Sequence, residues 1–473
     1  MEVGDYLKVC MILEGCYPYV FGGVSSWTHQ YIQAMPDTEF VIWTIGANEK
    51  DRGKFKFKLP DNVVEVHEVF LDNALQLTPS KHPSNIKITK EEETELKHLL
   101  LSDNVKWDVL FNCFHDKQIN PIDLLMSEYF INIVIDICRD KYPYISFAAY
   151  FHTVRSMMLP ELYLLTLPIP KADIYHSTAT GYSGLLGSLA AYENKKPFVV
   201  TEHGIYTRER EEELLRATWV VPYFRKQWIN LFYSFSACAY EYADKVTALF
   251  NRANEIQREL GCDVNKLSVI ENGIHFERFC DIPPKKPNGY IDIGAVVRIA
   301  KIKDIKTMIY AFAEVKMTIP NARLHICGDI DDEEYNKECH QLIEQLNVKD
   351  IIFTGVINVV EYMVKLDFTI LTSISEGQPL SVLESFAAGR PCVTTDVGCC
   401  RELLEDRDGL GVAGLVVPPM NKEKLAAAIV NMCIDETMRN NMAVVARKRA
   451  QTRYTHEISM DKYRLLYNEL MSK

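Results

Sequence analysis

The stretch Ser-Glu-Gly-Gln-Pro-Leu-Ser-Val-Leu-Glu at residues 375–384 decides the fold assignment. An apolar run at 366–371 precedes it and is typical of a buried strand, and the apolar run at 380–388 that follows is helical in character. We therefore expect Glu376 in a strand-to-helix loop and Glu384 about two turns into the helix. This strand-loop-helix order is the unit from which doubly wound α/β domains are built.

The turn between the two glutamates suits a phosphate-linked ligand. Gly377 and Pro379 let the backbone turn sharply and open a helix whose free N–H groups face outward. Such a loop can hold a polar, phosphate-linked ligand with amides and carboxylates together. Two glutamates at this spacing are common in an acidic chain, so the prediction depends on the whole string and its context.

Length and charge limit the classes of function. A chain of 473 residues is too long for one ordinary core and predicts two or three domains. Its 48% hydrophobic and 25% charged residues are typical of a soluble globular protein. The net charge of −12 argues against nucleic acid or an anionic membrane as the main partner, but leaves room for a local basic pocket.

The cysteines and the apolar segments predict a cytoplasmic protein. Thirteen cysteines, an odd number without zinc-like spacing, indicate reduced core thiols, and no metal site is expected. The acidic start at residues 1–5 lacks the charge of a signal peptide. The longest apolar stretch, at 147–170, is interrupted by charged residues and prolines, so it is not expected to span a bilayer.

Alternating strand-like and helical runs predict parallel sheets covered by helices on both faces. The strands expected in the first half lie at 6–13, 39–45, 63–69, 108–113, 173–176, 197–202, 245–249 and 267–271. Those expected in the second half lie at 291–297, 322–328, 350–354, 367–372, 391–395 and 414–417.

The domain boundaries follow from a change in composition. A Pro- and Gly-rich segment at 280–289 is typical of a linker. We therefore predict a Rossmann-like domain at 1–280, with a helical insertion around 114–170, and a second Rossmann-like domain at 281–455. The amphipathic tail at 456–473 is expected to cross back to the first domain. A ligand would lie in the cleft between the two domains.

A basic turn follows the first strand of the second domain. Arg298 and Lys303 lie between the strand at 291–297 and the predicted helix at 304–318, so they could converge with helix amides on a phosphate. A charge-assisted hydrogen bond contributes roughly 1.5–3 kcal/mol, so two such residues could hold a diphosphate without a metal. A solvated basic turn is the alternative. The loop of Glu376, expected at the same edge of the sheet, favours the phosphate site.

The first domain offers two matching positions. Gly22 and Gly23 follow the strand at 6–13 and precede a predicted helix at 24–34, where glycines let backbone amides approach a ligand closely. An ordinary tight turn is equally consistent with these two residues. His203 closes a later strand and is expected to point into the cleft, although a strand-end histidine is often a core or capping residue.

With these residues in place, the sequence resembles the GT-B nucleotide-sugar glycosyltransferases of family 4 over nearly its whole length. Two unusual strings, at 176–184 and 201–210, more narrowly resemble the PelF family of Pel exopolysaccharide transferases. The matching positions are Gly22-Gly23, Thr201 to Gly204, Asn272-Gly273, Arg298 with Lys303, Cys327 to Asp329, Glu376 to Glu384, and Gly398 with Glu402.

The resemblance implies four catalytic residues. Glu376 would hold hydroxyls of the donor sugar, and His203 would touch the sugar near its anomeric centre. Arg298 and Lys303 would bind the donor diphosphate and stabilise the charge that grows on the leaving group, which is usually the largest contribution in such chemistry.

The resemblance also implies a nucleotide-binding set. Glu384 would accept the ribose hydroxyls, Gly23 would lie against the phosphates, and the amides after Glu376 would assist it. The full set is Gly22, Gly23, Gly328, Gly377, Gln378, Pro379, Leu380, Ser381 and Glu384. One departure is His275, since many relatives carry aspartate after Asn-Gly-Ile/Val, which puts any hinge contact of that aspartate in doubt.

The function that the resemblance implies is retaining, metal-independent sugar transfer without a cofactor. The donor would be a UDP-sugar, with UDP-glucose expected, and the acceptor a growing exopolysaccharide on the cytosolic side of the membrane. Inner-membrane polysaccharide synthase subunits are expected as partners, and nucleic acid is not.

Two other classes of function compete with sugar transfer. A catalytically silent GT-B scaffold that binds UDP or partner subunits is the main alternative, and the filled site positions favour the enzyme over it. An NAD-dependent oxidoreductase lacks its fingerprint, because the GxGxxG match at 409–414 precedes a strand instead of following one.

Overall fold

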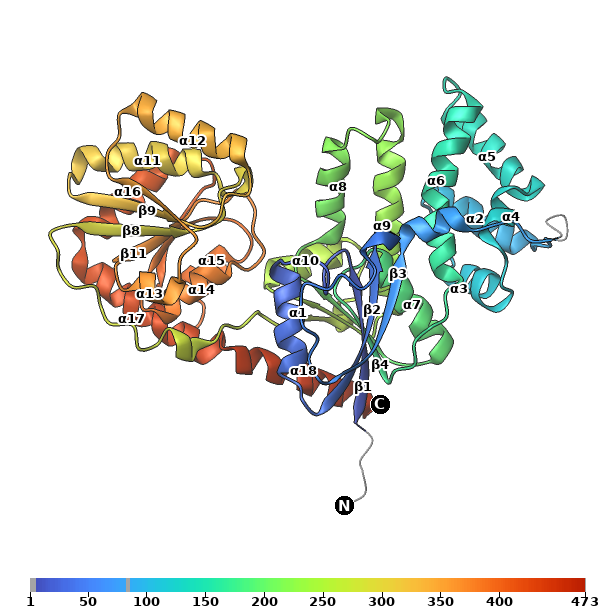
Figure 1. The fold of residues 1–473 in the computed structure, drawn as a ribbon, viewed down its shortest axis with the longest axis horizontal. Helices are drawn as coiled ribbons and strands as arrows, with labels where there is room; N and C mark the ends of the chain where they lie inside the picture. The colour runs from blue at the N-terminus through green and yellow to red at the C-terminus, as the bar shows by residue number, and fades with distance from the viewer. Residues whose placement is uncertain (1–5, 82–85, 473) are drawn as a thin grey trace, which may run out of the picture. The chain divides into compact units, whose positions relative to one another are not determined.

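A computed structural model of the chain describes residues 6–81 and 86–472. The chain forms two compact units, each built on its own parallel sheet (Figure 1). Unit 2 comprises Leu249–Ala253 and Val269–Leu465, and unit 1 comprises the described residues up to Ala248, together with Asn254–Ser268 and those from Leu466 on. Each unit is considered by itself.

Unit 1 is organised around a seven-stranded sheet in the order β3-β2-β1-β4-β5-β6-β7. Its interior strand β1 is hydrophobic on both faces, since Val9 to Leu13 are fully buried. The strand order reverses between β1 and β4, which pair in parallel. The strands are β1 (Leu7–Glu14), β2 (Thr38–Gly46), β3 (Val63–Phe70), β4 (Ile174–Ser177), β5 (Phe198–Glu202), β6 (Lys245–Ala248) and β7 (Leu267–Val269).

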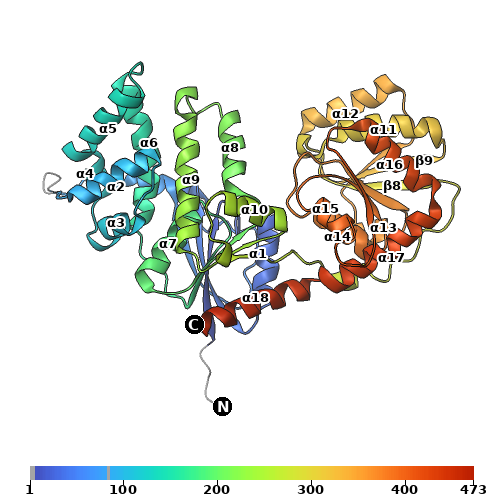
Figure 2. The same ribbon diagram turned by 180° about the vertical axis from the view of Figure 1, so that it is seen from behind.

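Helices cover this sheet, and α8 packs along α9 (Figure 2). The chain between β3 and β4 is helical; its first helix begins with a capping box in which Thr89 and Glu92 bond each other's backbone N–H groups. The helices are α1 (Gly23–Gln33), α2 (Lys90–Leu101), α3 (Trp107–Phe111), α4 (Pro121–Leu125), α5 (Glu128–Lys141), α6 (Phe147–Leu165), α7 (Tyr182–Asn194), α8 (Tyr206–Arg216), α9 (Arg225–Tyr242) and α10 (Asn251–Glu259), whose first residues belong to unit 2.

The strand expected at 108–113 is wrong. The chain there forms α3 and then a π-helical turn at Asn112–Asp116. Trp107, Leu110 and Phe111 are all buried, which is the i, i+3, i+4 spacing of a helix face. A short apolar run of this length does not by itself separate a buried strand from a buried helix.

Unit 2 contains a six-stranded sheet in the order β10-β9-β8-β11-β12-β13. Its strand order reverses between β8 and β11, which are parallel neighbours. All six predicted strands of this half are present. They are β8 (Ile291–Val296), β9 (Ala322–Cys327), β10 (Ile351–Gly355), β11 (Phe368–Leu371), β12 (Cys392–Thr395) and β13 (Gly414–Val417).

The helices of unit 2 lie on both faces of its sheet (Figure 1). Helix α16 packs against α11, and α17 packs against α14. Helix α18 begins in unit 2 and ends in unit 1. The helices are α11 (Ile305–Thr318), α12 (Glu333–Leu346), α13 (Val359–Met363), α14 (Leu380–Ala387), α15 (Cys400–Leu404), α16 (Lys422–Ile434), α17 (Glu436–Arg453) and α18 (His456–Met471).

The cysteines are unpaired: all thirteen carry free thiols, and all except Cys16 and Cys280 are buried. Within the described ranges, no helix is both long and apolar enough to cross a membrane.

Candidate active site

The loops of the decisive sequence meet at the carboxyl edge of the unit 2 sheet. The loop after β8 carries Arg298 and Lys303, and the loop after β11 carries Glu376. Because β8 and β11 are neighbours at the point where the strand order reverses, both loops open onto the crevice in which doubly wound folds bind ligands.

Lys303 and Glu376 form an ion pair at this edge. The Lys303 ammonium lies 2.5 Å from Glu376 Oε1, and the Ser373 hydroxyl donates to the same oxygen. Only 17% of the Lys303 side chain and 13% of the Glu376 side chain are exposed, so the pair is largely screened from water. The structure therefore brings together two of the four residues predicted to be catalytic.

Backbone-directed hydrogen bonds fix the two loops against each other. The Thr372 hydroxyl donates to the Lys303 carbonyl at 2.8 Å, and the Ile374 N–H donates to the Ile302 carbonyl at 2.9 Å. The Thr395 hydroxyl, from the end of β12, donates to the Ser373 carbonyl at 2.7 Å. The ion pair therefore lies on a rigid support from three strand ends.

A close backbone approach shapes the turn after Glu376. The Cys399 N–H donates to the Gly377 carbonyl at 3.0 Å. Gly398, with φ +53°, lies so close that a Cβ there would be 2.2 Å from the Gly377 carbonyl oxygen. Only glycine fits this position without movement of the loop. Pro379 is the N-cap of α14, and Leu380 and Ser381 are its first residues.

Glu384 lies on α14, half-buried, and its carboxylate has no hydrogen bond or ion pair with any residue that the structure describes. Burial raises the pKa of its carboxyl to about 6, although the nearby Arg278 guanidinium opposes that shift. A carboxylate that is desolvated and still unpaired can accept hydrogen bonds from ligand hydroxyl groups.

Arg298 lies apart from the ion pair. Its side chain is 63% exposed and bonds Asp331 at 2.7 Å. The local sequence pattern contains no signal that the Asp331 carboxylate pairs with Arg298. A phosphate that recruits Arg298 has to compete with Asp331.

Two other residues that were predicted to bind the nucleotide, Gly328 and Gln378, make structural contacts within the protein. Gly328 has φ +157°, and a Cβ there would be 2.0 Å from the Val297 carbonyl oxygen, so it keeps β9 close to the loop that carries Arg298. The Gln378 side chain is 7% exposed and accepts a 2.6 Å hydrogen bond from the Asn272 N–H. Its amide nitrogen has no partner among the described residues.

In unit 1, His203 follows β5 with its ring edge-to-face on Trp27, at a centroid distance of 4.5 Å. Burial lowers the pKa of His203 to about 4, so the ring is neutral at pH 7. Its Nε2 is buried and has no partner among the described residues. Gly22 and Gly23 are exposed at the start of α1, and a Cβ on either would meet no described heavy atom within 4 Å.

Sequence reasoning missed a second charged cluster at the carboxyl edge of unit 1. Glu14, the last residue of β1, accepts hydrogen bonds from the Tyr206 hydroxyl at 2.7 Å, from Arg210 at 3.0 Å and from the Ser183 N–H at 3.2 Å. Tyr206 and Arg210 belong to the string at 201–210. The sequence signal for this cluster was a glutamate at the end of an apolar strand, and Glu202 likewise ends β5.

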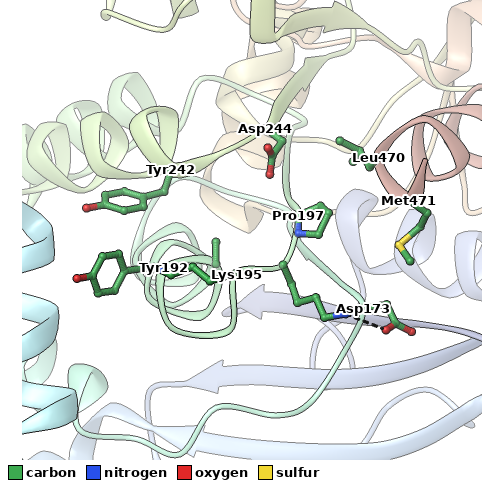
Figure 3. Close-up of a pocket in the computed structure, with 10 residues that line it drawn as sticks. Asp173, Tyr192, Lys195, Pro197, Tyr242, Asp244, Leu470 and Met471 are labelled. Atoms are coloured by element: carbon green, nitrogen blue, oxygen red, sulfur yellow. Dashed lines mark hydrogen bonds and ion pairs between the residues drawn. The ribbon is translucent and has the colours of Figure 1, made fainter. Parts of the chain in front are cut away.

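A cavity of about 550 Å³ in unit 1 lies at the other edge of the sheet (Figure 3). Asp173, Pro197 and Asp244 in its wall precede β4, β5 and β6, so it opens at the amino ends of these strands. Ligands of doubly wound sheets bind at the carboxyl ends, so this cavity is not the candidate active site. In the described part of the chain, no three His, Cys, Asp or Glu side chains gather as metal ligands.

Comparison with known families decides the assignment. The family "Domain of unknown function (DUF3492)" matches residues 7–265, more than half of the chain, and "Glycosyl transferases group 1" matches residues 281–449. The chain belongs to the DUF3492 family. The ion pair of Lys303 and Glu376, together with Glu384, therefore lies within the glycosyl transferases group 1 domain of this DUF3492 protein.

Similar proteins and structures agree with the match to glycosyl transferases group 1. An Escherichia coli "UDP-Gal:alpha-D-GlcNAc-diphosphoundecaprenol alpha-1,3-galactosyltransferase" is 24% identical over 80% of this chain and 94% of its own. A Staphylococcus aureus "Capsular polysaccharide biosynthesis glycosyltransferase CapM" is 23% identical over 63% of this chain and 77% of its own. The structure of Anabaena HepE in complex with UDP superposes with a TM-score of 0.62 at 15% identity, over 98% of this chain and all of that one.

These matches confirm the predicted GT-B class of fold, with two Rossmann-like domains. This DUF3492 protein is a glycosyltransferase that uses a nucleotide-sugar donor. The roles of the individual site residues stay predictions.

Proposed function

We propose that this chain is a retaining, metal-independent glycosyltransferase that moves glucose from UDP-glucose to a growing exopolysaccharide on the cytosolic side of a membrane. The observation that carries the proposal is the screened ion pair between Lys303 and Glu376 at the strand-order reversal of unit 2. It sets a cation for a diphosphate beside a carboxylate for sugar hydroxyls, where the fold binds its ligands.

The chemistry assigned to this pair is stabilisation of the leaving group. Transfer breaks the bond between the anomeric carbon of the sugar and the diphosphate oxygen, and forms a bond from the same carbon to the oxygen of an acceptor hydroxyl. That hydroxyl loses its proton, so the products are the glycoside, UDP and a proton. Negative charge grows on the departing diphosphate, and Lys303 lies ready to offset it without a metal ion. Arg298 adds a second cation once it leaves Asp331.

Glu376 and Glu384 divide the recognition of the donor. Glu376 accepts hydroxyls of the donor sugar, and its Oε1 is already oriented by Ser373 and Lys303. Glu384 accepts the ribose hydroxyls, and at pH 7 it is mostly ionised, since its pKa is about 6. The free N–H groups at the start of α14 add donors for the phosphates.

Relatives support a UDP-sugar donor and a polysaccharide acceptor. Anabaena HepE has been solved with UDP-glucose, and the names of relatives include a UDP-galactose-dependent galactosyltransferase and a capsular polysaccharide glycosyltransferase. The strings at 176–184 and 201–210, which resemble the PelF family, support the exopolysaccharide role and recruitment by polysaccharide synthase subunits.

The test is nucleotide release by the purified chain from a panel of sugar donors in the presence of EDTA. Release of UDP from UDP-glucose, and much less from UDP-galactose and UDP-N-acetylglucosamine, is the expected result. Release from another donor would correct the sugar, and loss of release in EDTA would overturn metal independence. Tight UDP binding without release, even with oligosaccharide acceptors added, would favour the catalytically silent scaffold.

A further inference from the structure

The segment Lys54-Phe-Lys-Phe-Lys58 of unit 1 separates its charged and apolar side chains by alternation. Lys54, Lys56 and Lys58 are exposed, whereas Phe55 and Phe57 are half-buried. Because exposure alternates along the segment, its outer side presents three ammonium groups and its inner side carries the two rings.

The two phenylalanines anchor this segment to the loop that follows β1. Phe57 packs against Tyr17 and Phe21, with ring centroids 5.1 and 5.0 Å apart, and Phe55 packs against Tyr19 at 5.6 Å. The backbone is held as well, because the Lys56 N–H donates to the Pro18 carbonyl at 2.8 Å. The three lysines are therefore presented on a fixed support.

The lysine side is unpaired. None of the three lysines forms an ion pair or a side-chain hydrogen bond with any residue that the structure describes. The carboxylates around the segment are engaged or lie at its ends: Glu49 pairs with Arg52, Glu68 with Tyr19 and Arg52, and Asp51 and Asp61 flank it. From residue 52 to residue 58 the chain carries four cations and no acid.

Large apolar side chains are exposed directly beside these lysines. Val20 is 53% exposed and Phe21 is 68% exposed, in the loop that Phe57 supports. Ammonium groups beside protruding apolar side chains are typical of surfaces that lie in the interface of a bilayer. The planar amide and carboxylate groups that bind glycan hydroxyls are absent from residues 52–58, so a sugar chain fits this surface poorly.

We propose that the segment at 54–58, together with Val20 and Phe21, docks unit 1 onto an anionic lipid membrane. The net charge of −12 argues against broad attraction to such a surface, but charges beyond about 10 Å are screened at physiological salt. The lysines would act on the lipid headgroups locally, and Phe21 would enter the acyl boundary. This inference does not depend on the donor or on catalysis.

The test is co-sedimentation of the full chain with vesicles of phosphatidylcholine containing 30% phosphatidylglycerol, compared with vesicles of phosphatidylcholine alone. The wild type is expected to bind the anionic vesicles and to release them in high salt. The triple variant K54Q/K56Q/K58Q is expected to bind at least ~10-fold more weakly, since each lysine near the surface contributes severalfold. Phe21→Ser is expected to weaken binding while the salt dependence remains.

A matched control separates the place of the charges from their number. K337Q/K424Q/K448Q removes three exposed, unpaired lysines from unit 2 and gives the same net charge. This control is expected to bind as the wild type does. Equal loss in both triple variants, or equal binding of the wild type to both kinds of vesicle, would overturn the proposal. Binding to a soluble polyanion that Phe21→Ser leaves unchanged would assign the surface to an acidic polymer instead.

Discussion

At the scale of single residues, substitution of Lys303 is the most direct test of the proposed mechanism. We expect Lys303→Ala to lower turnover by about 100-fold, because the charge on the leaving diphosphate loses its cation. Lys301→Ala is the matched control: its ammonium is exposed, 3.6 Å from Asp332, and turnover should change little. Steady-state UDP release measures both, and wild-type turnover in Lys303→Ala would contradict the assignment.

Loss of Lys303 also leaves Glu376 unpaired, so folding has to be checked separately from turnover. Removing one partner of a screened ion pair destabilises a protein through the charge that remains. Thermal unfolding of Lys303→Ala should therefore accompany the kinetics. A Lys303→Ala variant that is folded at the assay temperature and still slow would attribute the loss to catalysis.

The raised pKa of Glu384 predicts that donor affinity depends on pH. With a pKa of about 6, the carboxyl is mostly ionised at pH 7 and about one-tenth ionised at pH 5. Only the ionised form offers full acceptance to ribose hydroxyls, so affinity for UDP-glucose should fall about tenfold from pH 7 to pH 5. Calorimetric titration measures this; UDP-glucose is chosen because its diphosphate stays ionised throughout.

Glu384→Gln is the control for this pH effect, since it keeps the shape and removes the titration. At pH 7 its affinity for UDP-glucose should be weaker than that of the wild type. At pH 5 the variant and the wild type should bind UDP-glucose with nearly the same affinity. An unchanged tenfold fall in Glu384→Gln would assign the pH dependence to another group.

The sequence located these residues but not all of their partners. Glu376 and Lys303 could be named because they lie in loops that follow predicted strands, and Glu384 because it lies in the predicted helix that follows Glu376. The sequence did not predict the ion pair of Arg298 with Asp331 or the hydrogen bond from Asn272 to the Gln378 side chain. Both depend on rotamers and on contacts between segments far apart in the chain, which a local pattern does not contain.

At the scale of elements, the approach of the Gly398 loop to the Gly377 loop should decide whether the donor site forms. Gly398→Ala would place a Cβ 2.2 Å from the Gly377 carbonyl oxygen, so the turn after Glu376 has to move. We expect lower thermal stability and loss of most UDP-glucose binding, measured by thermal unfolding and calorimetry.

Gly409→Ala separates steric conflict from backbone strain. Gly409 also has a positive φ, +75°, but a Cβ there would have no described heavy atom within 4 Å. The change should cost about 1–2 kcal/mol of stability from the left-handed backbone alone and leave UDP-glucose affinity unchanged. Equal loss of affinity in both variants would show that the Gly377 contact is not the cause.

The strands were easier to predict than the elements around them. Every expected strand except the one at 108–113 formed, because apolar runs between turn signals specify buried parallel strands. The segment at 108–113 failed, since its aromatic residues fit a buried helix face as well as a strand. The position of α2 before that segment was the missing context.

At the scale of the whole molecule, the sequence predicted two doubly wound halves but not the strand order of either sheet. Alternating strands and helices predict parallel pairing. They do not predict at which strand the chain changes the direction in which it adds strands to the sheet, as it does between β1 and β4 and between β8 and β11. The reversal matters for function because it brings the loops of Lys303 and Glu376 to one crevice.

The tail of the chain completes the core of unit 1 with a buried hydroxyl. Tyr467, on α18, is 1% exposed; its hydroxyl accepts a 2.5 Å hydrogen bond from Tyr31 and lies 2.6 Å from His176 Nδ1. His176 Nε2 lies 2.7 Å from the Thr201 hydroxyl, so the network reaches β5. The carboxyl-terminal half of α18 therefore contributes Tyr467 to the polar core of the amino-terminal sheet.

We expect Tyr467→Phe to destabilise unit 1 by about 1–3 kcal/mol, because buried groups of Tyr31 and His176 lose a partner. Calorimetric unfolding should show the corresponding transition several degrees lower, whereas Leu465→Ala, which truncates an exposed side chain, should leave it in place. UDP-glucose affinity should change little in Tyr467→Phe, since Lys303, Glu376 and Glu384 belong to unit 2, and only the predicted contacts of Gly22, Gly23 and His203 come from unit 1. A loss of affinity that follows the loss of stability would instead show that the donor site depends on the integrity of unit 1.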